Sequence, residues 1–414
     1  MSRPFPQEAY AARIAFMVEL AEHLHAYGTT TPRLEGALEL VAQRLGLECE
    51  PWTNPTGMVL SFSDPMRPPG DGDATRVLRL PPGENDLGRL CDVDRIAEDV
   101  LAGRIGLAEG HAALRALDRP LTRRQNLMQV LGFGLAAVGI AGLLRLPWLD
   151  IGTAAVVGLV IGLLQVAART RPRLREANDA VSAMVAAAIT IMVAAWVAPL
   201  NLNTVIISAL IVLMPGLALT NAVNELTSQH LMSGTARFAG AVATMIMLTV
   251  GTMVAMVGME MLGVVPQVRA WRPQPDWVEW CGLAVASIAF AVLFRAKGRD
   301  WLLVALAAAT GYLVSRKAGL AWGAEFGIFL AALVVTAAGN GYARWAWRPG
   351  AVVRVPGIIL MVPGSASVRT LITSVQQQDV AAGQSAAMAV INILLSIVAG
   401  LIFGNLLLPA RRNL

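Results

Sequence analysis

The sequence predicts a polytopic α-helical membrane protein with ten transmembrane helices in two inverted five-helix repeats, and a small N-terminal α+β cytoplasmic domain. First, the chain of 414 residues is 56% hydrophobic and 15% charged, with a mean hydropathy of +0.58, beyond the range of a soluble protein. Second, the apolar runs fill residues 127–408, whereas residues 1–120 are richer in acidic groups. Third, a Pro-Gly pair interrupts an apolar run twice, at Pro215-Gly216 and Pro363-Gly364.

Residues 1–120 are expected to form the cytoplasmic domain. Helical periodicity covers 8–27, and a second helix runs to Leu45, with Thr31 as its cap, Pro32 in its first turn and Gly46 at its end. Strands are expected at 47–53, 56–63 and 74–80, followed by helices near 88–103 and 107–118. Because Met1 to Tyr10 lack an apolar core segment, we expect no signal peptide.

Metal-ligating residues do not cluster in the sequence. His23 and His25 are two apart on a predicted helix, so they point to different faces, and no acidic or cysteine partner is placed to join them. The three cysteines, Cys49, Cys91 and Cys281, lack ligand spacing. The sequence therefore predicts neither a metal site nor a cofactor.

Known catalytic and nucleic-acid signatures are absent from the chain. There is no P-loop, dinucleotide fingerprint or nucleophile elbow, so we expect that the protein is not an enzyme. Arg33 and Glu35 are expected to form a structural ion pair or a solvated surface. The net charge of +5 comes with basic residues in short loops, which favours membrane orientation over nucleic-acid binding.

Ten apolar segments have the length of a membrane span. Arginine is in excess in the loops on the side of the N-terminus, which places both termini in the cytoplasm. The first five spans belong to residues 121–265 and the second five to 266–414. The predicted spans are 126–144, 149–168, 179–198, 203–221, 238–262, 277–294, 301–315, 323–340, 353–372 and 386–408.

The fourth and ninth spans carry the two Pro-Gly pairs, and one further span follows each. Because each half has five spans, an odd number, the second half runs upside down relative to the first. Proline removes a backbone donor, so a broken span in lipid requires protein or water to satisfy the freed groups. A matched pair of broken spans is typical of a transporter whose site lies between them.

Several stretches resemble the bacterial threonine/serine exporter family. In the N-terminal domain these are Gly28-Thr-Thr-Thr-Pro-Arg-Leu-Glu35 and Asn54-Pro-Thr-Gly57; in the first half, Leu213-Met-Pro-Gly-Leu-Ala-Leu-Thr-Asn-Ala222 and Ser233-Gly-Thr-Ala-Arg237. In the second half, Met361-Val-Pro-Gly-Ser-Ala-Ser-Val-Arg369 resembles the matching signature, although Leu360 stands where the family often has proline. The resemblance covers nearly the whole chain in a fused two-half form. It implies proton-coupled export of threonine and serine, by antiport, across a bacterial inner membrane.

Polar side chains beside the two breaks are the candidates for substrate binding, because polar groups inside spans are costly. The alternative for each is a hydrogen bond between helices. Glu225 is the candidate for proton coupling, or else a helix-end carboxylate facing the cytoplasm. The substrate-binding candidates are Pro215, Gly216, Thr220, Asn221, Asn224, Pro363, Gly364, Ser365, Ser367, Arg369 and Thr370.

The expected partners are a small amino acid, protons and the lipid bilayer, without nucleic acid, and a homo-oligomer is compatible with the sequence. Two other functions stay open. One is export of a dicarboxylate of the succinate type, which the family resemblance also implies. The other is a membrane-anchored sensor or regulator, although a bare anchor would not need two matched broken helices.

Overall fold

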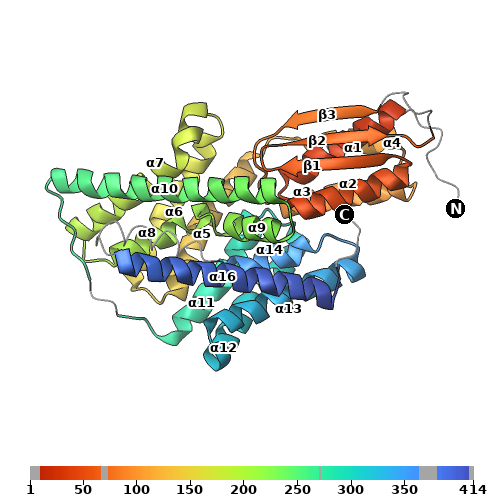
Figure 1. Ribbon diagram of the computed structural model, residues 1–414. Helices are drawn as coiled ribbons and strands as arrows, with labels where there is room; N and C mark the ends of the chain where they lie inside the picture. The colour runs from red at the N-terminus through yellow and green to blue at the C-terminus, as the bar shows by residue number, and fades with distance from the viewer. Residues whose placement is uncertain (1–9, 67–72, 270–271, 363–379, 410–414) are drawn as a thin grey trace.

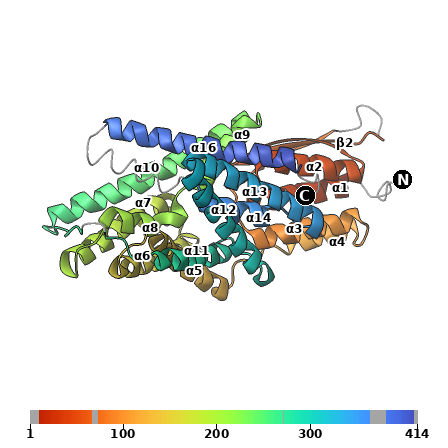
Figure 2. The same cartoon turned by 90° about the horizontal axis from the view of Figure 1, so that it is seen from below.

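The computed structural model describes residues 10–66, 73–269, 272–362 and 380–409. A small domain of helices and one sheet lies at one end of a larger helical body (Figures 1 and 2). Its elements are α1 (Tyr10–Ala26), α2 (Thr31–Leu45), β1 (Glu48–Asn54), β2 (Gly57–Ser63), β3 (Ala74–Arg79), α3 (Leu87–Leu101) and α4 (Leu107–Arg115). The strands form an antiparallel sheet in the order β1-β2-β3. The predicted elements are confirmed to within three residues.

A buried apolar core explains why these elements form. Phe16 and Leu20 of α1, Leu38 of α2, and Leu60 and Phe62 of β2 are fully buried in one cluster. They recur at helical spacing in the helices and at every second residue in β2, which are the periods of one-sided burial. The N-terminal domain therefore has a core of its own.

The predicted cap of α2 is wrong by one residue. Thr30 has the extended backbone of the N-cap, with φ −71° and ψ 148°, and its side chain makes no capping bond. Thr31 is already helical, and its hydroxyl is free to reach a residue outside the domain. Pro32 in the first turn and Gly46 in the left-handed conformation after the last turn are confirmed.

The helical body begins with α5 (Arg123–Leu143), α6 (Trp148–Ala168), α7 (Pro172–Trp196), α8 (Leu202–Leu210), η1 (Ile211–Leu213), α9 (Gly216–Thr227) and α10 (Leu231–Met261). It continues with α11 (Asp276–Leu293), η2 (Gly298–Asp300), α12 (Trp301–Trp322), α13 (Ala324–Ala346), α14 (Ala351–Ile359) and α16 (Val380–Leu407). Among the described residues, seven helices are long and apolar enough to cross a membrane, or eight if α8–η1 and α9 count as one broken span. A count of ten spans stays a prediction.

Helix α12 is longer than the sequence indicated. The predicted span 301–315 stops before the basic pair Arg316-Lys317, yet the helix continues through this pair to Trp322. The guanidinium of Arg316 pairs with Glu279 of α11 and lies 5.9 Å from the ring centroid of Trp280. Because these partners accommodate the charge, the helix does not have to end there.

The two halves of the body share one order of elements. Each has three long helices, then a short helix that leads to a Pro-Gly pair, then a long final helix. Helices α5 and α11, the first of each half, pack together where Gly139 meets Ala286 and Gly142 meets Gly282. The third helix packs on the last in both halves, α7 on α10 and α13 on α16. This order is the one an internal repeat predicts; the inversion stays a prediction.

The N-terminal domain contacts both halves. On the second half, Leu87 and Cys91 of α3 pack in the cluster of Phe290 and Phe294, and Phe294 accepts a backbone hydrogen bond from Leu87 at 2.9 Å. Arg295 and Lys297 pair there with Glu84, Asp86 and Asp92 of the domain. On the first half, the start of α2 meets α9 and α10. A displacement of the domain would thus act on both halves.

Candidate functional site

The first Pro-Gly pair breaks its span, as predicted. The helix formed by α8 and η1 ends at Leu213, Met214 is extended with φ −69° and ψ 129°, and α9 starts at Gly216 with its axis turned by 56°. Proline causes the break, because Pro215 has no N–H to continue the helical ladder. Ile211 to Leu213 adopt the tighter 3-10 conformation before the break.

The polar residues after the break lie on α9 with different exposures. Thr220 is buried, with 1% of its surface exposed, and its hydroxyl has no hydrogen-bond partner within the described residues. Asn221 and Asn224 are half-buried. A buried hydroxyl without a partner is costly, so Thr220 is the strongest of these candidates for contact with a bound molecule.

The second Pro-Gly pair, at which the sequence predicts a break, falls outside the described residues. Pro363, Gly364, Ser365, Ser367, Arg369 and Thr370 all lie there. The elements on either side of this segment, α14 and α16, both contact α9. Leu219 of α9, for example, packs with Val390 and Leu394 of α16. The helices adjoining the two breaks are therefore neighbours.

Glu225, at the far end of α9, is fully buried and accepts four hydrogen bonds. Arg237 of α10 donates two of them, Nη2 to Oε1 at 2.9 Å and Nε to Oε2 at 3.0 Å. Ser233 donates from its hydroxyl to Oε2 at 2.9 Å, and the backbone N–H of Thr31 donates to Oε1 at 3.2 Å. Both carboxylate oxygens are therefore engaged, and the two-point pair with arginine is the strongest type of charged hydrogen bond.

This carboxylate also joins the N-terminal domain to the membrane part. The Thr31 hydroxyl lies 2.7 Å from the Ser233 hydroxyl, and Glu35 of α2 accepts from His230 at 3.1 Å. Glu35 also accepts two bonds from Thr53 of β1, at 2.8 and 3.0 Å. We call these contacts of Thr31 and Glu35 with Glu225, His230, Ser233 and Arg237 the interdomain cluster. The expected pair of Arg33 with Glu35 does not form, because Glu35 faces His230 instead.

Arg33 makes a contact that the sequence did not predict. Burial lowers the pKa of its guanidinium to about 10. Its contact within the described residues is Asn340 of α13, whose Oδ1 lies 3.5 Å from Nη2. Asn340 is itself held by Asn405 and the Leu408 carbonyl, at 2.8 Å each. No carboxylate pairs with Arg33 in the described part of the chain.

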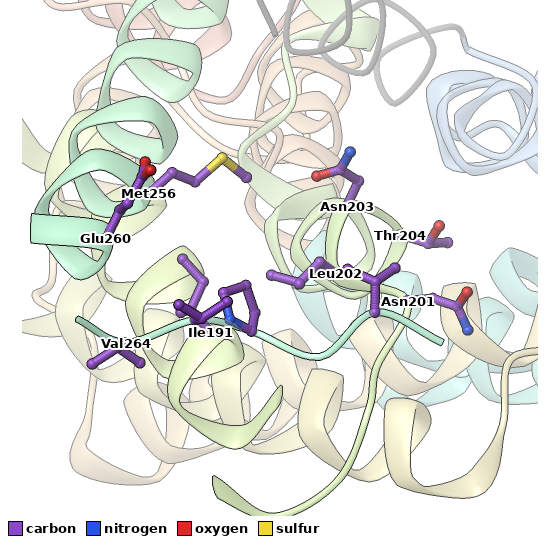
Figure 3. A pocket seen from close by; sticks show the side chains of 11 residues that line it. Ile191, Asn201, Leu202, Asn203, Thr204, Met256, Glu260 and Val264 are labelled. Carbon is purple, nitrogen blue, oxygen red and sulfur yellow. The ribbon is translucent and has the colours of Figure 1, made fainter. Parts of the chain in front are cut away.

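A cavity of about 610 Å³ lies at the start of α8, at the opposite end of that helix from Pro215. In Figure 3, Met256 and Glu260 project from α10 on one side, and Asn203 and Thr204 from α8 on the other. Its wall also includes Ile191, Asn201, Leu202, Val264, Val265, Pro266 and Val268. The polar residues Asn201, Asn203 and Thr204 at the start of an otherwise apolar helix are the sequence signal of this cavity.

Two protein-family models together match most of the chain. One family model described as a threonine/serine exporter matches residues 15–258, and a second with the same description matches residues 279–407. The chain is 24% identical over 389 residues to pheromone-regulated membrane protein 10 of Pichia sorbitophila, covering 89% of this chain and 38% of that protein. The protein of the same name from Eremothecium gossypii is 23% identical over 376 residues, covering 89% of this chain and 50% of that protein.

A third relative, the uncharacterized protein C7D4.12c of Schizosaccharomyces pombe, is 30% identical over 158 residues, which is 37% of this chain and 20% of that protein. The chain thus spans half or less of the length of these curated relatives. No solved structure matches the chain.

Proposed function

This chain belongs to the threonine/serine exporter family, and from that premise we propose that it exports small hydroxylated amino acids across a membrane in exchange for protons. The observation that carries the proposal is the broken span at Pro215. A break in lipid persists only where it lines a site or a water-filled space, and here it is followed by the buried, unpartnered hydroxyl of Thr220. The substrate would lie between this break and the one at Pro363, as in an inverted-repeat transporter.

The charges support a path for the substrate. An amino acid carries a carboxylate and an ammonium group, and each needs a partner. At the end near the N-terminal domain, Arg33 has donors for a carboxylate, which a guanidinium binds at two points. At the other end, Glu260 in the wall of the cavity offers a carboxylate for the ammonium group. If both termini are cytoplasmic, Arg33 serves entry and the cavity serves release.

Glu225 is proposed to couple transport to protons. In the described conformation its charge is neutralised by Arg237, so a proton would enter only when Arg237 moves away. Protonation would neutralise the carboxylate, weaken the hydrogen bonds that it accepts from Arg237 and from the Thr31 N–H, and loosen the interdomain cluster. Uptake of a proton and movement of the domain are then one event, which is what coupling requires.

Transport into proteoliposomes tests this function. The purified protein is reconstituted, and uptake of labelled threonine and serine is followed with and without a pH gradient. We expect gradient-driven flux in the wild type and at least a tenfold loss in the double variant Pro215→Ala, Gly216→Ala. Gly152→Ala is the matched control, because nothing lies within 4 Å of an added Cβ there.

Three outcomes would count against the proposal. The first is the absence of threonine and serine flux from a preparation whose thermal unfolding curve shows that the protein is folded. The second is full flux in the Pro215–Gly216 variant. The third is inhibition of uptake by succinate but not by unlabelled threonine, which would indicate the dicarboxylate function instead.

Glu225→Gln should abolish the response to the pH gradient, whereas an unchanged response would exclude Glu225 as the coupling residue.

A further inference from the structure

A group of titratable side chains in the N-terminal domain takes no part in the proposed transport. Glu19 and His23 of α1 lie against Asp118, which belongs to the segment between α4 and the first long helix, α5. Their ligand atoms all lie within 4.8 Å of one another. His111 of α4 adds a ring nitrogen, with Nε2 3.2 Å from a carboxylate oxygen of Glu19. We call Glu19, His23, His111 and Asp118 the α1–α4 cluster.

The orientation of His23 is set by its backbone contact. Nδ1 lies 2.8 Å from the Glu19 carbonyl oxygen and donates to it, so in the neutral ring Nε2 carries the lone pair. That lone pair faces Asp118 Oδ1 at 3.2 Å, and Nε2 is buried without a hydrogen-bond partner within the described residues. Two electron-rich atoms at this distance repel each other unless a cation lies between them or the ring is protonated.

One distance in the cluster matches the separation of two ligands of one ion. Donor atoms about 2.1 Å from a tetrahedral ion lie roughly 3.4 Å apart, close to the 3.2 Å between His23 Nε2 and Asp118 Oδ1. A metal-bound histidine commonly donates its other N–H to a carbonyl, which is what Nδ1 does here. The geometry of His23 is therefore that of a metal ligand.

The charge balance also favours a divalent cation. Glu19, Glu22 and Asp118 contribute −3 and Arg115, which pairs with Glu19 at 3.1 Å, contributes +1, which leaves −2 with neutral imidazoles. A single divalent ion would cancel this excess.

We propose that Glu19, His23 and Asp118 form a site for a borderline divalent cation of the Zn²⁺ class, with His111 beside it in contact with Glu19. Imidazole and carboxylate ligands suit such an ion better than Mg²⁺ or Ca²⁺, which prefer oxygen alone. The ion fastens the segment 116–122 to α1. Because this segment leads into α5, occupancy of the site sets how tightly the domain is tied to the first helix of the membrane part.

Metal titration of the full chain tests the proposal. The protein is purified in detergent, stripped with a chelator and titrated with Co²⁺, followed by visible absorption, and then with Zn²⁺ in competition. We expect one saturable ion per chain, with the intense absorption of a four-coordinate nitrogen-containing site. Asp118→Asn and His23→Gln should each weaken binding at least tenfold.

The controls separate a built site from chance binding. Glu109→Gln, on α4 near His111 but outside the cluster, should bind like the wild type. The Asp118 side chain is 69% exposed, so Asp118→Asn tests the site even if His23→Gln fails to fold. Zn²⁺ should also slow proteolysis within 116–122 in the wild type and not in Asp118→Asn. Absence of saturable binding, or equal affinity in Asp118→Asn and Glu109→Gln, would show an adventitious ion only and overturn the proposal.

Discussion

The pair of Glu225 with Arg237 should be a large stabilising contact between α9 and α10. Glu225 is fully buried, and the side chain of Arg237 is 22% exposed. Removing one partner of a buried pair costs about 3–5 kcal/mol, because the other charge stays unpaired. Water reaches Arg237, so we expect the lower value, about 3 kcal/mol, for Glu225→Gln. Glutamine keeps only one of the two acceptor oxygens, and the donor that loses its acceptor adds about 1 kcal/mol.

A double-mutant cycle isolates the pair from the other contacts. Glu225→Gln, Arg237→Met and the double variant are compared by denaturant unfolding in detergent, and we expect a coupling energy of about 2 kcal/mol. The exposed pair of Arg145 with Asp276 is the matched control, because it has a short contact of 2.5 Å but Asp276 is 80% exposed. Its coupling should stay below about 1 kcal/mol.

The contact between the N-terminal domain and the helical body is tested by a second measurement, limited proteolysis. Because Thr31 and Ser233 meet at Glu225, Glu225→Gln should also speed proteolysis of the segment 116–122, which joins the N-terminal domain to α5. A coupling energy below about 0.5 kcal/mol would refute the reasoning, since values of that size are within the scatter of independent sites. Unchanged proteolysis with a large coupling energy would show that the pair holds α9 to α10 without holding the domain.

Three further predictions concern other parts of the chain. Arg33→Gln should raise the half-saturating substrate concentration several-fold, while the exposed Arg44→Gln should not; equal effects would exclude a specific carboxylate contact. Burial raises the pKa of Asp94 to about 8, above its unfolded value of about 3.9, so the folded state binds an extra proton and loses stability as pH rises from about 4 to 8. Asp94→Asn should remove this decline in unfolding measurements at pH 5 and 8.5, and a decline unchanged from the wild type would contradict it. Gly142→Leu should destabilise by about 1–3 kcal/mol, because an added Cβ would meet Gly282 Cα at 2.9 Å, whereas Gly152→Leu should be neutral in the same thermal unfolding assay.

The α1–α4 cluster illustrates why the sequence did not predict a metal site. Within their own helix, His23 and His25 lie two residues apart and point to different faces, so they do not form a pair of ligands. Glu19 is one turn from His23, but Asp118 and His111 come from another element, more than eighty residues later. Only the packing of α4 and the following segment on α1 brings Asp118 to His23 and His111 to Glu19. His25 differs, because its ring contacts the Pro81 carbonyl and lies outside the cluster.

The sequence by itself determined the helices, the strands and the break at Pro215. Each depends on the local order of residues: the length of an apolar run, its period, and the missing donor of proline. Only the tertiary structure decided what Glu225, Arg33 and Glu35 contact. Thr31 and Glu225 are 194 positions apart, and whether two such residues meet depends on how the domain packs on both halves of the helical body. The resulting pairs, and the charges they leave unpaired, are where the proposed function can be tested.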